Sequence, residues 1–441
     1  MAYSYLTFAQ AVAALAGRLQ DTGFVYWNQP DELLNAIIES VRFHQLLTAS
    51  YKQKIAFPTA ADVLYYDLPN LTGATNGAAI AYTATDVEVA NNVLAALLEP
   101  ALAPGWVGTG QFTFAQLQVA MQNRLNRFLD DTGCRVAQQT IGGPSPTTDI
   151  APLPEGTLDV RRAAWIPLPQ TTPPANPAYP LGRLDEWAEQ AYVPGAEQNP
   201  DQPVSYSVFG VGPQQIRSVP PPLNEGSLDL LLVMSGPTVN LNPASPVILG
   251  IPDDLSPALK WGALADILGT DGPSRDYSRA AYCEQRYQEF VQLARIYPSV
   301  LTADILNVSC GVGSVFDMDA YLPDWQQTTG QPSFVSMCGR NLACVGQTPD
   351  GAYGVGLWMV VNAPVSGYLQ VPRGQIDPVL DYAQHIASFK MGGAEFDGTS
   401  RLYANLIAAA KLQNARLDAI AFYRGQLQQP ALKGEMEVAR A

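Results

Sequence analysis

The spacing of apolar side chains predicts a mainly helical chain with a few short strands. Apolar residues at intervals of three and four predict helices over 5–20, 31–51, 86–99 and 113–131. The same spacing predicts two helical hairpins, 254–269 with 275–297 and 377–390 with 398–424. Dense apolar runs predict strands in pairs, each pair leading into one hairpin: 228–234 and 245–249, then 353–361 and 365–371.

Proline interrupts this pattern in the middle of the chain. Residues 144–222 hold 17 of the 36 prolines. Because proline lacks the backbone N–H that a β-ladder needs and breaks helices, this stretch predicts an extended arm, with a turn or two of helix over 183–192. We interpret the Gly- and Cys-containing segment 311–350 as an insertion, and the polar residues 425–441 as a C-terminal tail.

The first part of the chain contains an internal repeat. The tetrapeptide Thr-Phe-Ala-Gln at 7–10 recurs at 113–116, and an Asp-Thr-Gly tripeptide follows each copy, at 21–23 and 131–133. Each of these glycines stands where the end of a helix favours a residue in the left-handed conformation. We interpret the two copies as front-half repeats, A and A′.

The last part of the chain repeats at a constant spacing of 121 residues. The matched pairs are Pro257 and Pro378, Leu259 and Leu380, Trp261 and Tyr382, Leu268 and Phe389, and Tyr282 and Tyr403. Most of these side chains are apolar or aromatic, as a shared helix-packing core requires. We therefore infer a duplicated back half, B and B′, and the order A, A′, B, B′ along the chain.

These patterns together predict an α+β fold. It would consist mainly of helical hairpins from a duplicated unit, with small antiparallel β-sheets and Pro-rich extended arms. The predicted segments are 1–143 (A and A′), 144–227 (Pro-rich arm), 228–310 (B), 311–350 (insertion), 351–424 (B′) and 425–441 (tail).

Composition narrows the classes of function. The 441 residues include 40 acidic and 25 basic side chains, a formal charge of −15, which disfavours general binding to a phosphate backbone. The N-terminal residues show no signal-peptide pattern, and no apolar run reaches the roughly 18 residues that a membrane span needs, so we expect a soluble chain with no membrane partner. Five cysteines without a CxxC pair argue against a disulfide scaffold or a zinc knuckle.

The paired Asp-Thr-Gly tripeptides raise the possibility of an aspartic peptidase. In those enzymes two carboxylates share one proton and activate a water molecule. The peptidase motif follows an apolar strand, whereas Asp21 and Asp131 each follow a predicted amphipathic helix. Helix capping by the glycine explains both copies, so we predict no catalytic role for either aspartate.

Other candidate chemistry is equally incomplete. His44 and His385 lie in predicted helices, outside any ligand spacing, and His385 is interpreted as a packing or surface residue. The glycine runs at 311–314 and 354–356 lack a following phosphate-binding lysine. The aspartates at 317, 319 and 324 lack the glycine and glutamate of a calcium-binding loop. We predict no catalytic, cofactor-binding or metal-binding residues, no cofactor and no enzymatic activity.

The B segment resembles a known family. Ile251–Leu255, Leu259–Leu268 and Asp276–Tyr287 are similar to the C-terminal helical hairpin of tailed-phage (podovirus-type) head-to-tail adaptor proteins. In that family a strand ending in a hydrophobic-Pro pair precedes a helix with a "YGALADLL"-like core and then a Tyr-containing helix. The front half, with two helices and a strand ending in Leu-Pro, also looks like that family. The chain departs from it in carrying two adaptor-like units, and the resemblance does not cover 144–222 or 311–350.

The resemblance implies a structural protein of the virion. Family members form a dodecameric ring below the portal, extend the DNA channel and give tail proteins a platform. The implied partners are therefore further copies of this chain in a ring, the portal protein and downstream nozzle or fibre proteins, with genomic DNA passing through without specific binding. The implied location is the neck or tail of the virion, after synthesis in the host cytoplasm. The alternatives are a tail-nozzle or fibre-anchoring structural protein, and an aspartic-type peptidase.

Overall fold

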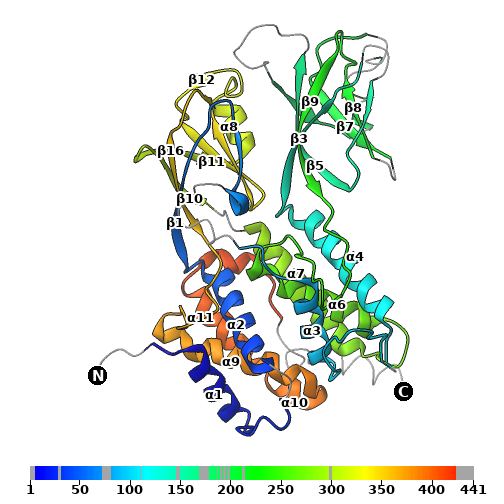
Figure 1. The fold of residues 1–441 in the computed structure, drawn as a ribbon, viewed down its shortest axis with the longest axis vertical. Coiled ribbons are helices and arrows are strands. Elements are labelled where there is room, and N and C mark those ends of the chain that lie inside the picture. Colours follow the sequence, from blue (N-terminus) through cyan, green and yellow to red (C-terminus); the bar gives the residue numbers. More distant parts are fainter. Residues whose placement is uncertain are drawn as a thin grey trace, which may run out of the picture.

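A body of helices forms one end of the molecule, and two curled β-sheets form the other end (Figure 1). The computed structural model describes residues 5–27, 31–71, 81–109, 111–145, 149–167, 178–185, 187–188, 191, 195, 199–210, 214–296 and 300–423. The two sheets contact each other where the Tyr65 hydroxyl, in a strand of one sheet, donates to the Asp229 carboxylate, in a strand of the other, at 3.1 Å. The chain passes repeatedly between helices and sheets, so neither end of the molecule is one continuous stretch of sequence.

The first sheet has seven strands in the order β1-β16-β10-β11-β13-β14-β2. They are β1 (Lys52–Pro58), β2 (Tyr65–Asp67), β10 (Val300–Ile305), β11 (Val308–Gly313), β13 (Phe334–Cys338), β14 (Leu342–Gly346) and β16 (Gly354–Val360). Helix α8 (Val315–Tyr321) connects β11 to the parallel strand β13 through a loop whose strand β12 (Thr329–Gly330) pairs with β15 (Thr348–Pro349). The other neighbouring strands of this sheet are antiparallel.

The second sheet has seven strands in the order β3-β9-β5-β6-β7-β8-β4. They are β3 (Val136–Gly142), β4 (Ile150–Pro152), β5 (Thr157–Pro167), β6 (Tyr179–Arg183), β7 (Ser205–Phe209), β8 (Gln215–Val219) and β9 (Gly226–Met234). Here β6 and β7 are parallel, and the other neighbours are antiparallel.

The two sheets have the same topology. When the strands of each are counted in chain order, the spatial order is first, seventh, third, fourth, fifth, sixth, second in both. The parallel pair is the fourth and fifth strand in both. The chain therefore contains one fold twice, and the second copy lies between the second and third strands of the first. We call residues 5–71 with 300–423 the outer module, and residues 81–296 the inner module.

Each module also contributes helices to the helical body. The outer module supplies α1 (Phe8–Arg18), α2 (Glu32–Thr48), α9 (Ile376–Ser388), α10 (Gly393–Gly398) and α11 (Ser400–Lys411). The inner module supplies α3 (Asp86–Ala96), α4 (Phe114–Thr132), α6 (Pro257–Gly269) and α7 (Tyr277–Ile296). Short 3-10 segments accompany them: η1 (Leu68–Asn70), η4 (Asp253–Leu255), η5 (Arg373–Gln375), η6 (Phe389–Met391) and η7 (Ala415–Ala419).

Helix α1 of the outer module corresponds to helix α3 of the inner module. Thr7, the N-cap of α1, forms a β-bridge with Tyr368, and Thr85, the N-cap of α3, forms the same bridge with Ile248. The hydrogen bonds beside these bridges also recur. They are Phe8 N–H to Gly367 O (3.1 Å) and Leu369 N–H to Leu6 O (2.8 Å), matched by Asp86 N–H to Val247 O (2.9 Å) and Leu249 N–H to Ala84 O (3.0 Å).

Helices α2 and α4 correspond in the same way. Each ends at a residue in the left-handed conformation, Ala49 (φ 49°) or Gly133 (φ 56°), and leads directly into the first strand of its sheet. Buried residues match along the two helices: Leu33 with Leu117, Ala36 with Ala120, Ile37 with Met121, and Val41 with Leu125. The back-half hairpins α6–α7 and α9–α11 complete the correspondence, and the predicted pairs Trp261 with Tyr382 and Tyr282 with Tyr403 are buried in both copies.

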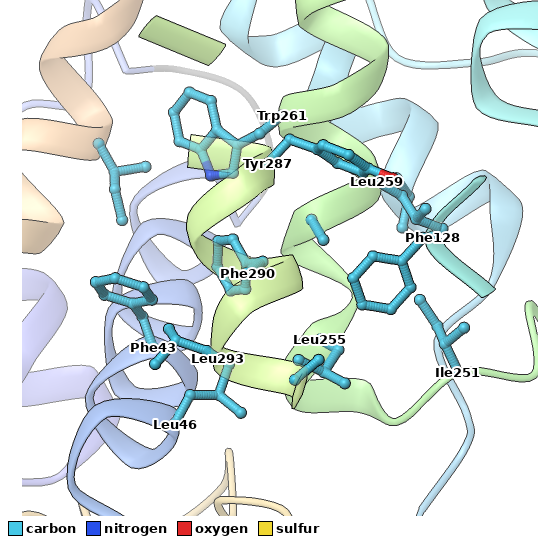
Figure 2. Close-up of a cluster of buried hydrophobic side chains, with 14 of the residues drawn as sticks. Phe43, Leu46, Phe128, Ile251, Leu255, Leu259, Trp261, Tyr287, Phe290 and Leu293 are labelled. Atoms are coloured by element: carbon cyan, nitrogen blue, oxygen red, sulfur yellow. The ribbon is translucent and has the colours of Figure 1, made fainter. Parts of the chain in front are cut away.

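One hydrophobic core holds the helices of both modules together. Figure 2 shows Phe43 and Leu46 of α2 in the same cluster as Phe128 of α4 and residues of α6 and α7. The ring of Phe43 lies 5.3 Å, centroid to centroid, from that of Phe290 in α7, so the core crosses the boundary between modules. Each sheet has a smaller core of its own.

The predicted fold class is wrong in its proportions. The protein is α+β, but it is built on two large curled sheets rather than mainly on helical hairpins with small sheets. The predicted extended arm, 144–227, supplies the strands from β4 to β8 and the start of β9. Pro152 and Pro167 are the last residues of their strands, where a missing N–H removes little of the ladder. Segment 311–350, expected as an insertion, likewise supplies central strands of the outer sheet.

Three local predictions also need correction. The Thr-Phe-Ala-Gln repeat pairs α1 with α4, whereas the structure pairs α1 with α3; each tetrapeptide is a capping box that begins its helix. The predicted strands 245–249 and 365–371 are irregular and carry only the single bridges at Ile248 and Tyr368. Gly133 is the predicted left-handed cap, but α1 ends at Arg18, before Gly23. Residues 425–441 lie outside the described residues, as do 186, 189, 190 and 192 of the predicted helical stretch 183–192.

Candidate assembly surfaces

The outer module has a groove between α2 and the end of α9, and helix α3 of the inner module fills it. The groove walls are Glu32, Asn35, Ala36 and Glu39 on one side and Ile386, Ala387 and Lys390 on the other. Asn92, Ala95 and Ala96 of α3 occupy the space between the walls, with Lys260 of α6 at one end. The cavity that remains has a volume of only about 40 Å³, so the two modules are closely packed here.

Charged side chains fix this contact between the modules. Lys260 Nζ donates to Glu39 Oε2 at 2.7 Å, and the Trp261 indole N–H donates to Glu39 Oε1 at 2.7 Å. Arg42 of the outer module lies 3.2 Å from Ser256 Oγ and 3.9 Å from Glu88 of α3. Because the Glu39 and Lys260 side chains are less than a tenth exposed, removing one partner would leave an uncompensated buried charge.

The inner module has the corresponding groove, but in the described structure it is open. It lies between α4 and the turn that joins α6 to α7, and its volume is about 830 Å³. Its walls are the counterparts of those in the filled groove. One wall of the open groove consists of Gln116, Val119, Ala120 and Asn123, which correspond to Glu32, Asn35, Ala36 and Glu39 of the filled groove. The other wall consists of Ala265, Asp266 and Gly269, which correspond to Ile386, Ala387 and Lys390.

The open groove leaves apolar surface on α4 in contact with solvent. Val119 is 56% exposed, although the buried stripe of the same helix is fully covered. The groove also carries the acidic side chains of Asp266 and Asp271. Asp266 is held by Arg124, whose Nε donates to its Oδ2 at 2.9 Å. One feature of the sequence indicates a contact surface here: Val119 is apolar although it lies outside the main apolar stripe of the helix. A single residue of this kind is weak evidence.

Both modules also expose aromatic side chains in the crossover between their parallel strands. In the outer module this crossover contains α8, where Phe316 is 60% and Tyr321 is 76% exposed. In the inner module Trp187, between β6 and β7, is 85% exposed. Helix α8 lies at the sheet end of the molecule (Figure 1), and Ser314 and Asp317 form a capping box at its start. These residues give the sheet end a second candidate contact surface.

The structure does not bring the two Asp-Thr-Gly aspartates together. The Asp21 carboxylate accepts backbone N–H bonds from Val25, Tyr26 and Trp27 at 2.8–3.0 Å, and these bonds lower its pKa. Asp131 instead forms ion pairs with Arg127 and Arg295. A proton-sharing dyad needs two adjacent carboxylates, so this arrangement gives the peptidase alternative no geometric support.

The two histidines are buried in the helical body. Burial lowers the pKa of His44 to about 4 and that of His385 to about 3, so both are neutral at pH 7. His385 Nε2 lies 2.9 Å from the Tyr282 hydroxyl, and its Nδ1 lies 2.8 Å from Thr399 Oγ1. This agrees with a packing role for His385.

The remaining candidate residues have structural partners of their own. Asp317 caps α8, and Asp319 is paired with Arg162. The glycine runs at 311–314 and 354–356 fall largely in strands β11 and β16. The five cysteines are free thiols. Among the described residues no group of three or more His, Cys, Asp or Glu side chains is placed to hold a metal ion. No helix in that part of the chain combines the length and apolarity needed to cross a bilayer.

Comparison with known protein families and curated proteins found no match.

Proposed function

We propose that the protein is a structural subunit of a phage virion, a head-to-tail adaptor that forms a ring between the portal and the tail and extends the DNA channel. The observation that carries this proposal is the duplicated helical hairpin. The residues that resemble the adaptor family, between Ile251 and Tyr287, form η4, α6 and the first half of α7 in the centre of the helical body. Helices α9 and α11 repeat that hairpin in the outer module.

The charge of the chain suits a passive DNA channel. With a formal charge of −15, many copies arranged in a ring would repel the phosphate backbone where their acidic side chains face the lumen. Genomic DNA would then pass through without specific binding. The partners in this proposal are further copies of the chain, the portal protein, and downstream nozzle or fibre proteins in the neck or tail of the virion.

A tail-nozzle or fibre-anchoring role is the second candidate. It is favoured by the exposed aromatics Phe316, Tyr321 and Trp187, which both modules carry in the same crossover. Large apolar side chains that are exposed in this way are typical anchors of protein interfaces. In this role the sheets would bind a tail component, and the helical body would not need to contact the portal.

Native mass spectrometry and cryo-electron microscopy of the full chain, alone and mixed with the portal of the same phage, test the proposal. A closed ring that binds the portal coaxially is the expected result, and its mass gives the copy number. A ring that binds tail proteins but ignores the portal would favour the nozzle role. A chain that stays monomeric with and without the portal would overturn the adaptor function.

A further inference from the structure

The contact between the modules has two complementary sides, and each module carries both. One side is the groove beside α2 or α4, and the other is the helix α1 or α3. Within one chain, helix α3 of the inner module packs in the groove of the outer module. Among the described residues of one copy, nothing joins the groove of the inner module to helix α1 of the outer module.

Helix α1 is partly exposed on the face that its counterpart α3 places in the filled groove. The three α3 residues in the filled groove, Asn92, Ala95 and Ala96, correspond to Ala14, Gly17 and Arg18 of α1. Gly17 is exposed, and so are Ala9, Gln10 and Ala13 on the neighbouring turns. A Cβ atom added at Gly17 would meet nothing within 4 Å. The face is therefore open at Gly17, while Ala14 and Arg18 are half-buried and Arg18 pairs with Asp377 and Asp381 of α9. The small side chains at positions 14 and 17 allow a helix to approach closely.

The same molecule cannot combine the two free sides. Figure 1 places α1 at one side of the helical body and α4 with α6 at the other. A second copy of the chain, however, can bring its α1 to this groove.

We propose that helix α1 of one copy docks into the open groove between α4 and the α6–α7 turn of the next copy, repeating between chains the contact that α3 makes within the chain. Such a contact joins two different surfaces, so it continues from copy to copy and closes a ring when the rotation per copy allows. The inference rests on the proposed ring function and names the surfaces that would build the ring.

The polar residues at the proposed contact are compatible. Inside the chain, Glu39 of the groove meets Lys260. The corresponding residues between chains are Asn123 of the groove and Asp381 of the arriving copy, an amide donor and a carboxylate acceptor. In its own copy the Asp381 carboxylate also accepts from Arg18 at 2.6 Å and from Asn405 at 3.1 Å. Arg18, which ends the docking face, pairs with Asp377 at 2.8 Å and with Asp381 at 2.6 Å in its own copy. Asp266 on the groove wall pairs with Arg124, so this end of the contact would bring together two ion pairs rather than two unpaired charges.

Disulfide trapping tests the contact directly. We would make Gly17→Cys and Val119→Cys together in full-length protein that also carries Cys310→Ser, because the other native cysteines are buried. The expected result after mild oxidation is a ladder of covalently linked chains whose largest member matches the ring in native mass spectrometry. The matched control replaces Val119→Cys by Val308→Cys, which is 66% exposed on the sheet and should give no ladder.

A charge variant tests the same contact without cysteine. Asn123→Asp would place a carboxylate opposite Asp381 of the next copy, and we expect at least a tenfold weaker self-association with an unchanged melting temperature. Asn123→Gln keeps the amide and should assemble as the natural protein does. Asn123 is exposed in the single copy, so neither change disturbs the fold.

The outcomes separate this inference from the proposed function. A ring that forms without cross-linking between positions 17 and 119 would overturn the docking contact and leave the adaptor function standing. A disulfide from position 119 to a portal or tail protein would overturn it as well, since the groove would then serve another partner. A chain that neither assembles nor cross-links would overturn both.

Discussion

At the residue scale, Arg286 and Glu289 place two opposite charges in the centre of the helical body. Both side chains are fully enclosed, and they contact each other. The Arg286 guanidinium also donates to the Tyr403 hydroxyl at 2.8 Å, and it lies over the ring of Phe43 at 4.3 Å. We expect Arg286→Met to destabilise the protein by roughly 3–5 kcal/mol, because Glu289 is left buried without its partner. Chemical denaturation measures this change.

The double variant Arg286→Met with Glu289→Met separates the ion pair from simple packing. Because a buried pair replaced by apolar side chains of similar volume is often neutral, the second change should restore part of the lost stability. The recovery is partial because Glu289 also accepts the Tyr403 hydroxyl and the Tyr423 N–H, which lose this acceptor. Tyr382→Phe, which removes only one hydroxyl of the network, should cost about 1 kcal/mol. A double variant as unstable as the single one would show that the charge of Glu289 is not the cause.

Asp254 makes the stability depend on pH. Its carboxylate lies at the contact between the modules and accepts the Ala363 N–H at 3.1 Å. Burial raises its pKa from 3.8 to about 7, although Arg42 opposes this and Asp253 reinforces it. The folded chain therefore holds a proton that the unfolded chain has released between about pH 4 and pH 7. Because the folded state binds more protons there, the contribution of Asp254 to stability falls as the pH rises through this window.

Asp254→Asn should remove this part of the pH dependence. The amide oxygen still accepts the Ala363 N–H, and no proton is needed to keep the group neutral. We expect the variant to gain stability relative to the natural protein between pH 4 and pH 7, by about 1.4 kcal/mol for each pKa unit that is realised. Urea denaturation at several pH values measures the difference, and parallel pH profiles of the two proteins would contradict the assignment.

Single residues were predicted with mixed success, and the reason is local. The capping role of Gly133 follows from the residues around it. For His385 the sequence predicted a packing or a surface role, and the structure shows that the side chain is buried. The groove residues Val119 and Asn123 were not predicted. The apolar Val119 outside the main stripe is a weak signal, and Asn123 has the polarity of any exposed helical position.

At the scale of elements, the corresponding helices α2 and α4 offer a matched exchange. Both end in the left-handed conformation, but α2 uses Ala49 there and α4 uses Gly133. The left-handed conformation costs a residue with a Cβ roughly 1 kcal/mol more than glycine. We expect Ala49→Gly to stabilise the protein by about that amount and Gly133→Ala to destabilise it at least as much. Thermal unfolding measures both, and equal effects of one sign would contradict the shared geometry.

The sequence pattern predicted the back-half hairpins but not the two large sheets, and each outcome has a physical reason. The hairpins repeat large buried residues at one spacing, as Trp261 with Tyr382, and such a core leaves a clear periodic pattern. The strands of the inner sheet are short and are separated by prolines, so each carries too few alternating positions to stand out. The Thr-Phe-Ala-Gln repeat led to the wrong pairing of the front-half helices. A capping box depends only on the start of a helix, so it can occur in two helices that do not correspond in the fold.

At the scale of the whole molecule, one module is inserted into a turn of the other. In the inner module the second and third strands, β4 and β5, are joined by the four residues 153–156. In the outer module the corresponding connection, between β2 and β10, holds the entire inner module. Long insertions into surface turns add little closure entropy, so such a chain can keep both sheets intact. The nesting places the predicted segments in the order A, A′, B, B′ along the chain. Segments A and B′ belong to the outer module, and segments A′ and B belong to the inner module.

The shared core makes a prediction about how the two modules unfold. Phe290 of α7 is fully buried against Phe43 of α2, so it belongs to the inner module but supports the outer one. Phe290→Ala should cost about 3–5 kcal/mol. Because the cavity opens between the modules, hydrogen exchange should accelerate in α2 and α9 as much as in α4 and α7. Leu230→Ala, in the separate core of the inner sheet, is the matched control and should leave the exchange of α2 and α9 nearly unchanged. If Phe290→Ala loosened only the inner helices, each module would be stable by itself, and the nested chain would be two tethered domains rather than one body.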